Sequence, residues 1–192
     1  MNWLGNIIQR HVSDNDTVVD LGCGIMQATT DILEQMSENQ NTKYRIKKKL
    51  FKSSNLKCKL ILGCDLWEDY LKVANRYWPV IKLGMNELNK LVDNSFDIVL
   101  CLDVLEHLEL QEALYAIEHM KRIARRKVII YTPSKYITNE EHVDNAWGLG
   151  ENPYQIHKCF LEPETLTNLG FDISFPEPDK NTLGIFNKSS TT

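Results

Sequence analysis

The chain has 192 residues, of which 43% are hydrophobic and 25% are charged, and its formal net charge is −4. This length and composition are typical of a globular protein with one full hydrophobic core, so we expect a single domain over residues 1–192. No apolar run approaches the ~18 residues that a membrane-spanning helix needs. The first twelve residues, MNWLGNIIQRHV, are too polar for a secretory signal and predict an amphipathic helix instead.

The cysteines are odd in number and form no C-x-x-C pair. Several lie in or beside expected strands, where a free thiol acts as a small hydrophobic side chain. The five are Cys23, Cys58, Cys64, Cys101 and Cys159. This pattern favours a reduced, cytoplasmic protein and argues against a zinc site, so we expect no bound metal.

Apolar runs with strand character alternate with helical patterns along the chain, which predicts an α/β fold with a mostly parallel sheet. Strands are expected near 17–21, 59–64, 80–84, 96–102 and 127–132. Helices are expected near 26–38, 67–77, 105–108 with 111–123, and 162–169. The last two apolar runs, 171–175 and 183–186, have no helix between them and are expected to pair as an antiparallel hairpin.

The segment 16–26 indicates a ligand site at the end of the first strand. Residues 17–19 are β-branched and favour a buried strand, whereas Gly22 and Gly24 allow a sharp turn close to a ligand. Asp20 places a fixed negative charge at the strand exit. Such a charge repels a pyrophosphate but attracts an ammonium or sulfonium group.

Basic residues are concentrated in the segment 43–59, which holds eight Lys or Arg and no acid. We interpret the surrounding stretch, about 39–58, as an insertion before the second strand. It is either a solvated surface loop or a binding surface for phosphate groups, including those of RNA. A second basic cluster, within 121–127, is expected to end a helix, where cations favour the helix dipole.

Residues that directly follow the other strands are further candidates, because open parallel sheets bind ligands beyond the carboxyl ends of their strands. Asp65 follows the second strand and can accept hydrogen bonds from both hydroxyls of a ribose. Met85 and Asn86 follow the third strand and offer an apolar face and an amide to an adenine ring. Leu102 and Asp103 end the fourth strand.

The motifs VVDLGCG, ILGCD, DNSFDIVLCLDVLEHLE and RKVIIYTP resemble the class I S-adenosylmethionine-dependent methyltransferases, in particular their small-molecule branch. The resemblance spans about residues 16–135, with a weaker similarity in HKCFLEPETLTNLGF. It implies a Rossmann-like, doubly wound sheet of seven strands that ends in an antiparallel hairpin. It also implies the cofactor S-adenosylmethionine, the product S-adenosylhomocysteine and a small-molecule acceptor.

The same resemblance implies where each part of the cofactor binds. Asp20, Gly22, Cys23 and Gly24 would surround its methionine part, Asp65 and Leu66 its ribose, Met85 and Asn86 its adenine, and Leu102 and Asp103 its sulfonium.

Two features depart from related motifs. Met26 stands where the family usually has a third glycine, so its side chain either narrows the cofactor site or packs inward. Asp65 lies much farther from the glycines than the ~20 residues of the dinucleotide fingerprint, and the basic insertion explains the excess if it loops out. Gln27 occupies the third glycine position of that fingerprint, which argues against hydride transfer with NAD.

Two histidines are candidate catalytic bases for a hydroxyl acceptor. His107 follows the fourth strand, and His157 lies in a late loop. Each also has an ordinary structural interpretation, as a packing or hydrogen-bonding residue. The long connection 134–160 is expected to act as a lid, and its aromatic side chains, Tyr136, Trp147 and Tyr154, are candidates for acceptor binding.

Three functions are compatible with these residues. The first is methyl transfer to a small molecule such as a sugar, a lipid or another metabolite, which the compact chain favours. The second is methylation of RNA or protein through the basic segment 43–59. The third is binding of S-adenosylmethionine without catalysis.

Overall fold

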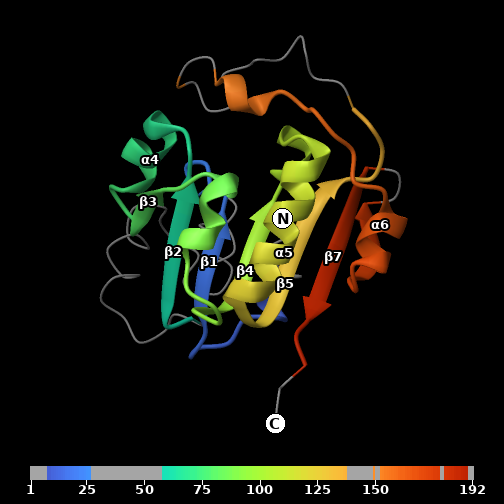
Figure 1. Cartoon of the computed structure of the whole chain (residues 1–192). Helices are drawn as coiled ribbons and strands as arrows, with labels where there is room; N and C mark the ends of the chain where they lie inside the picture. Colours follow the sequence, from blue (N-terminus) through green and yellow to red (C-terminus); the bar gives the residue numbers. More distant parts are fainter. Residues whose placement is uncertain (1–7, 27–57, 138–148, 150–151, 178–179, 190–192) are drawn as a thin grey trace.

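A computed structural model describes residues 8–26, 58–137, 149, 152–177 and 180–189. Within these ranges, seven strands form one sheet in the order β3-β2-β1-β4-β5-β7-β6 (Figure 1). The parallel strands are β1 (Thr17–Leu21), β2 (Leu60–Asp65), β3 (Val80–Lys82), β4 (Phe96–Leu102) and β5 (Ala124–Pro133).

The sheet ends in an antiparallel hairpin of β6 (Asp172–Glu177) and β7 (Asn181–Asn187), with β7 paired to β5. The predicted fold class, an α/β Rossmann-like sheet of seven mostly parallel strands with a terminal hairpin, is therefore confirmed. β6 continues through Pro176, which was expected in the turn. As an edge strand it tolerates a residue that donates no backbone hydrogen bond.

Three α-helices are described: α4 (Glu68–Ala74), α5 (Leu110–Ile123) and α6 (Pro163–Asn168). Three short 3-10 helices lie in the connections between these elements. They are η1 (Met85–Lys90) after β3, η2 (Leu105–His107) after β4 and η3 (Pro153–Gln155) between β5 and α6. α5 begins with a reciprocal cap, in which the backbone N–H of Glu109 donates to the Glu112 carboxylate. Its buried face consists of Ala113, Ala116, Ile117, Met120 and Ile123 at helical spacing.

The central strands are buried on both faces, as expected for a parallel sheet with long apolar runs. Val19, Val99 and Val128 point into one core cluster, which α5 covers. Their neighbours on the strands, including Val18 and Ile98, point into a second cluster on the opposite face. This alternation explains why β-branched residues occupy successive positions of β1.

The basic cluster within 121–127 was expected at a helix end, and this was only partly correct. α5 ends at Ile123 and β5 begins directly at Ala124, so Arg125 and Arg126 belong to the strand. Arg125 donates to the backbone carbonyls of Asn94 and Ser95 and to the Asp97 carboxylate. Arg125 therefore fixes the loop before β4 by direct hydrogen bonds rather than through the helix dipole, and Arg126 pairs with Asp16 before β1.

Several expected features lie outside the described residues. They include most of the helix expected near 26–38, nearly all of the insertion at about 39–58 and Trp147. None of the helices in the described ranges has the length and apolar character that crossing a membrane requires.

Candidate active site

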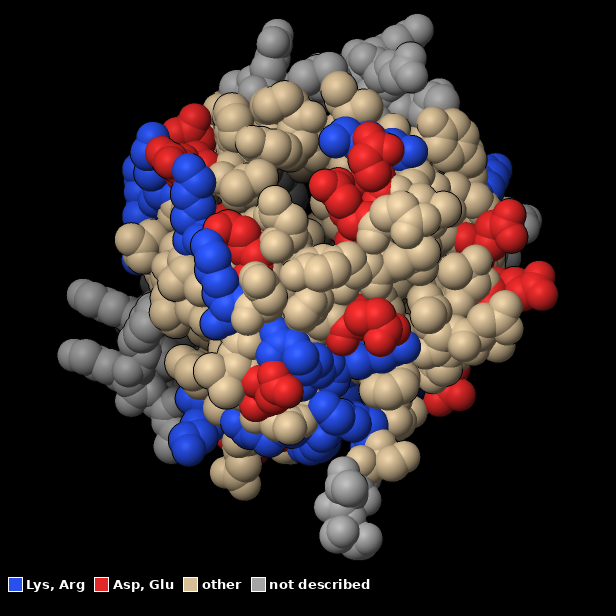
Figure 2. Space-filling view, in the orientation of Figure 1, with Lys and Arg blue, Asp and Glu red and all other residues tan. Residues whose placement is uncertain are grey.

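The carboxyl ends of the parallel strands meet at one edge of the sheet, where a cavity of about 660 Å³ opens. Strand order reverses between β1 and β4, so this edge is the position at which open α/β sheets bind ligands. Figure 1 shows η3 lying above these strand ends, and Figure 2 shows a hollow in the same part of the surface. All ten residues expected to bind the cofactor line the cavity: Asp20, Gly22, Cys23, Gly24, Asp65, Leu66, Met85, Asn86, Leu102 and Asp103.

The turn after β1 is held against β2 by its backbone. The N–H groups of Gly22 and Cys23 both donate to the carbonyl oxygen of Cys64, at 2.8 and 2.9 Å. Gly22 has φ +73°, and a Cβ atom there would stand 2.3 Å from a methyl carbon of Val104. Glycine is therefore required at this position both by the backbone conformation and by the close approach of Val104.

Asp65 lies beside this turn, as the placement of the second strand predicts. One carboxylate oxygen accepts from the N–H of Gly24 and the other from the N–H of Trp67, both at 2.8 Å. Burial raises the pKa of Asp65, and these backbone donors partly oppose that effect. Asp65 also lines the cavity, so its carboxylate faces a bound ligand. The long segment before β2 therefore does not displace Asp65 from the glycine turn.

The connection after β3 forms another wall of the cavity. The N–H of Gly84 donates to the Glu87 carboxylate, which fixes the start of η1 where Met85 and Asn86 lie. Met85 packs at the edge of the first core cluster, so its thioether forms an apolar surface next to the amide of Asn86. This pairing suits a flat ring with polar edges.

Asp103 follows β4 in a left-handed conformation, with φ +53°, and its N–H donates to the carbonyl oxygen of Tyr131 at 2.8 Å. Its side chain is exposed to the cavity but closely surrounded by protein, which raises its pKa to about 6. Asp20 lines the same cavity from β1 and is 3% exposed. Two carboxylates therefore face the space between β1 and β4.

Met26 does not narrow the cavity. It is fully buried in the second core cluster and is not among the residues that line the cavity. Its φ is +61°, so it keeps the left-handed conformation that a glycine would adopt freely. Gly63 of β2 makes room for it, because a Cβ on Gly63 would stand 2.7 Å from the sulfur of Met26.

The two candidate catalytic histidines lie together, although 50 residues of sequence order separate their loops. Their rings meet edge to face with centroids 4.9 Å apart, and both line the cavity. Burial, together with the neighbouring His157, lowers the pKa of His107 to about 4. His107 is therefore neutral at physiological pH and is a poor proton acceptor.

Glu106 adjoins this pair and was not singled out from the sequence. It is 3% exposed, and burial followed by the charge of Asp103 raises its pKa to about 8. Its carboxylate accepts a hydrogen bond from Thr132 at 3.1 Å. Its position between a strand end and a histidine was the only signal in the sequence, because the neighbours that bury it come from β5 and the late loop.

Of the candidate acceptor-binding residues that the structure describes, one lines the cavity and one does not. Tyr154 lines the cavity from η3, with its ring edge to face against Trp67 at 6.1 Å. Tyr136 is 53% exposed and does not line the cavity. Sequence reasoning missed other residues of the late loop that do line it, namely Asn152, Gln155 and Lys158.

The fold and the site define an α/β domain with a cofactor-sized cavity at the switch point of its sheet. Residues 49–132 match the family model described as "Methyltransferase domain". A search of curated proteins finds no match to the sequence. Among solved structures, the chain is similar to magnesium protoporphyrin IX methyltransferase from Synechocystis PCC 6803 with bound S-adenosylhomocysteine, at 15% identity and a TM-score of 0.61 over 98% of this chain and 83% of that one.

Two further structures are similar over nearly the whole chain. The PH0226 protein from Pyrococcus horikoshii shares 18% identity, with a TM-score of 0.60 over 97% of this chain and 88% of that one. A SAM-dependent methyltransferase from Aquifex aeolicus shares 15% identity, with a TM-score of 0.58 over 95% and 88%. At these identities the structures establish the shared fold. The chain is therefore similar to the family described as "Methyltransferase domain" over residues 49–132, and it shares its fold with these structures.

Proposed function

We propose that this protein binds S-adenosylmethionine in the cavity at the carboxyl edge of its sheet and transfers the methyl group to a small-molecule acceptor. The observation that carries the proposal is the convergence of all ten expected cofactor residues, from four separate strand ends, on one cavity. Its volume of about 660 Å³ lies within the range of ~300–1,000 Å³ usual for small-molecule sites.

Each part of the donor has a chemically suitable partner. Asp20 and Asp103 supply negative charge toward the ammonium and sulfonium groups, which favours this donor over a nucleotide phosphate. Asp65 accepts from the ribose hydroxyls, and Met85 with Asn86 receives the adenine.

Methyl transfer needs positioning more than covalent help from the protein. A lone pair of the acceptor forms the new bond to the methyl carbon while the carbon–sulfur bond breaks and leaves its electron pair on sulfur. In-line alignment of the two reactants contributes up to roughly 7–11 kcal/mol to such a step. We assign Tyr154 to the acceptor side of the cavity, because it lines the cavity from η3, the short helix that lies above the strand ends in Figure 1.

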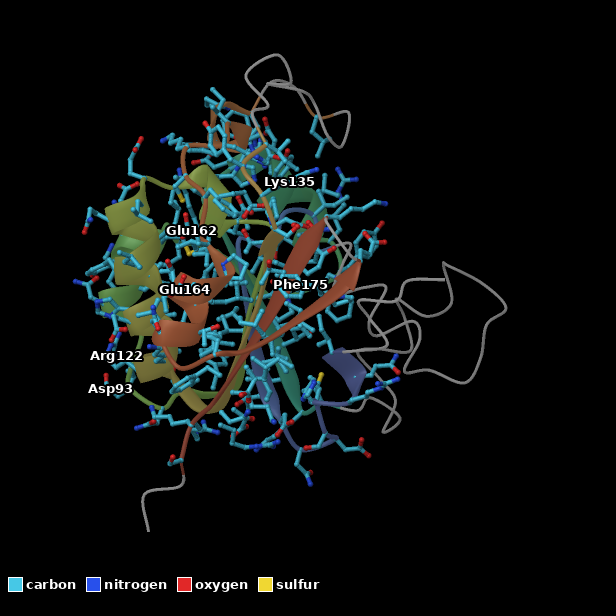
Figure 3. All side chains as sticks on the ribbon, turned by 90° about the vertical axis from the view of Figure 1, so that its right-hand side faces the viewer. Asp93, Arg122, Lys135, Glu162, Glu164 and Phe175 are labelled. Carbon is cyan, nitrogen blue, oxygen red and sulfur yellow. The ribbon has the colours of Figure 1, made fainter. Side chains whose placement is uncertain are left out.

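Calorimetric titration of S-adenosylmethionine into the full chain and into Asp65→Asn tests the cofactor site. We expect the substitution to weaken binding by about tenfold, since a charge-assisted hydrogen bond contributes ~1.5 kcal/mol. Asp93→Asn is the matched control, because the exposed Asp93 side chain pairs with Arg122 at the end of α5 far from the cavity (Figure 3). Equal affinity of the Asp65→Asn variant and the wild type would refute the ribose assignment.

A labelled-methyl transfer screen with separate metabolite, RNA and protein fractions tests the acceptor. Label in the metabolite fraction supports the proposal. Label confined to RNA or protein would replace the acceptor class, and tight cofactor binding without any transfer would leave a binding protein.

A further inference from the structure

We propose that Glu106, His107 and His157 form a binding site for a divalent transition-metal ion at the acceptor side of the cavity. Each residue offers one ligand atom, and these atoms all lie within 4.8 Å of one another. All three residues line the cavity, so an ion held there faces the space assigned to the acceptor. The role of the ion in methyl transfer rests on the proposed function, whereas the metal site itself does not.

The ligand set selects the class of ion. Two imidazoles and one carboxylate suit zinc and its first-row neighbours better than magnesium or calcium, which prefer oxygen ligands alone. Three protein ligands also leave coordination positions open, as in catalytic rather than structural sites. The cysteine pattern led to the expectation of no bound metal, and this proposal departs from that expectation because the cluster contains no cysteine.

The backbone brings the ligands together. The carbonyl oxygen of Glu106 accepts from the N–H groups of Lys158 and Cys159, at 2.7 and 3.2 Å. These two bonds attach the late loop to η2 and place the His157 ring against that of His107. The cluster is therefore fixed by the fold rather than by a chance approach of surface side chains.

Hydrogen bonds outside the cluster orient two of the ligands. Nδ1 of His157 donates to the carbonyl oxygen of Ile137 at 2.7 Å, which leaves the lone pair on Nε2. Thr132, which is 1% exposed, donates to one oxygen of Glu106 at 3.1 Å. Metal-binding histidines and carboxylates are typically held by such outer contacts.

One atom of the cluster lacks a partner among the described residues. Nδ1 of His107 is buried and accepts or donates no hydrogen bond there, which is costly unless something else satisfies it. Glu106 and Asp103 also line the same cavity, and both carry a carboxyl group. A bound dication would satisfy the imidazole nitrogen and offset the repulsion between the carboxylates.

The ion would bind an oxygen atom of the acceptor at its open positions. A hydroxyl bound to a dication loses its proton to solvent more readily, and the resulting oxygen then attacks the methyl carbon.

The test is calorimetric titration of Zn²⁺ into the chelator-treated full chain, with Co²⁺ absorption as a second readout because its visible bands report imidazole ligation. We expect a single site in the wild type and at least ~100-fold weaker binding in His157→Gln, since even loss of an outer contact costs ~10–100-fold. The matched control is His119→Gln, because His119 lies on α5 against Tyr115, away from the cavity. This variant should bind Zn²⁺ like the wild type.

Glu106→Gln provides a second ligand variant that keeps an oxygen for Thr132 and should lose Zn²⁺ affinity in parallel. Circular dichroism and S-adenosylmethionine titration of each variant show that it is folded with its cofactor site intact. Absence of Zn²⁺ and Co²⁺ binding in the wild type, or unchanged affinity in both ligand variants, would overturn the metal site. Metal binding without cofactor binding would instead contradict the proposed function and leave the metal site standing.

Discussion

Acidic side chains have opposite roles at the carboxyl edge and the amino edge of the parallel sheet, where its strands end and begin. At the carboxyl ends of the strands, burial raises the pKa values of Asp65, Asp103 and Glu106, and none of the three forms a salt bridge with a cationic side chain of the described residues. At the amino edge, Asp16 pairs with Arg126 and Asp97 pairs with Arg125. An acid neutralised within the fold stabilises it, whereas an acid left without a cation can bind one from outside.

The largest expected loss of stability comes from adding a methyl group to Gly22, in the turn at the carboxyl edge. Gly22→Ala combines a left-handed alanine with a Cβ 2.3 Å from Val104, whose branched side chain has little freedom to move. We expect a loss of about 2–5 kcal/mol in the free energy of unfolding, from ~1–2 kcal/mol of backbone strain and ~1–3 kcal/mol of overpacking. Urea denaturation measures it, and cofactor titration should show weaker binding.

Gly170→Ala is the control for backbone strain. Gly170 has φ +87°, but a Cβ there would meet only Phe186, at an ordinary 3.6 Å. It should cost only about 1–2 kcal/mol and leave cofactor affinity unchanged. Equal losses in the two variants would show that Val104 exerts no steric effect on the glycine turn.

The next largest effect is expected from removing the Asp97 carboxylate at the amino edge. The Asp97 carboxylate, 15% exposed, accepts from the N–H and hydroxyl of Thr17 and pairs with Arg125. Asp97→Ala leaves the Thr17 N–H without this acceptor, so we expect a loss of about 2 kcal/mol in the free energy of unfolding. Cofactor affinity should not change, because Asp97 lies at the opposite edge from the cavity. A variant with weakened cofactor binding but normal stability would contradict the division between the edges.

The contribution of Asp97 to stability is also expected to depend on pH. Burial alone would raise the pKa of Asp97, but the hydrogen bonds from Thr17 and the Arg125 guanidinium lower it overall. Its folded pKa is therefore below the unfolded value of about 3.9, so its stabilising contribution is complete above that pH and is lost as pH falls through the folded pKa. The difference in unfolding free energy between the wild type and Asp97→Asn should be constant near neutral pH and shrink in strong acid. A difference that grows on acidification would reverse the assigned sign.

The sequence predicted the strand ends well because local patterns determine them. The apolar run before Asp20 and the glycines after it define both the end of β1 and the turn, so Asp65 and Asp103 could be placed by analogy at their own strand ends. The start of β5 was wrong because α5 passes into the strand at Ala124 without a turn residue. Helical and strand patterns overlap there, and only pairing with β4 decides the boundary.

The metal-like cluster could not be predicted for a different reason. His107 and His157 were each identified, but their contact depends on two backbone hydrogen bonds to Glu106 that no sequence pattern encodes. The burial of the Met26 side chain in the core also depends on a residue distant in the sequence, because the space it fills exists only in the absence of a side chain at Gly63 of the neighbouring strand. Local chemistry identified the candidates, and tertiary packing determined which of them meet.

The smallest effect is expected at the exposed end of the amino edge. Asp93 pairs with Arg122, and Figure 3 shows the two side chains together at one end of α5. The Asp93 side chain is 65% exposed, and Arg122 also donates to the carbonyl oxygens of Leu88 and Leu91. Asp93→Asn should therefore change the free energy of unfolding by no more than ~0.5 kcal/mol, because solvent screens the pair and the guanidinium keeps its backbone acceptors. Urea denaturation in low and high salt measures this, and a loss as large as that of Asp97→Ala would show that exposure does not separate the two ion pairs.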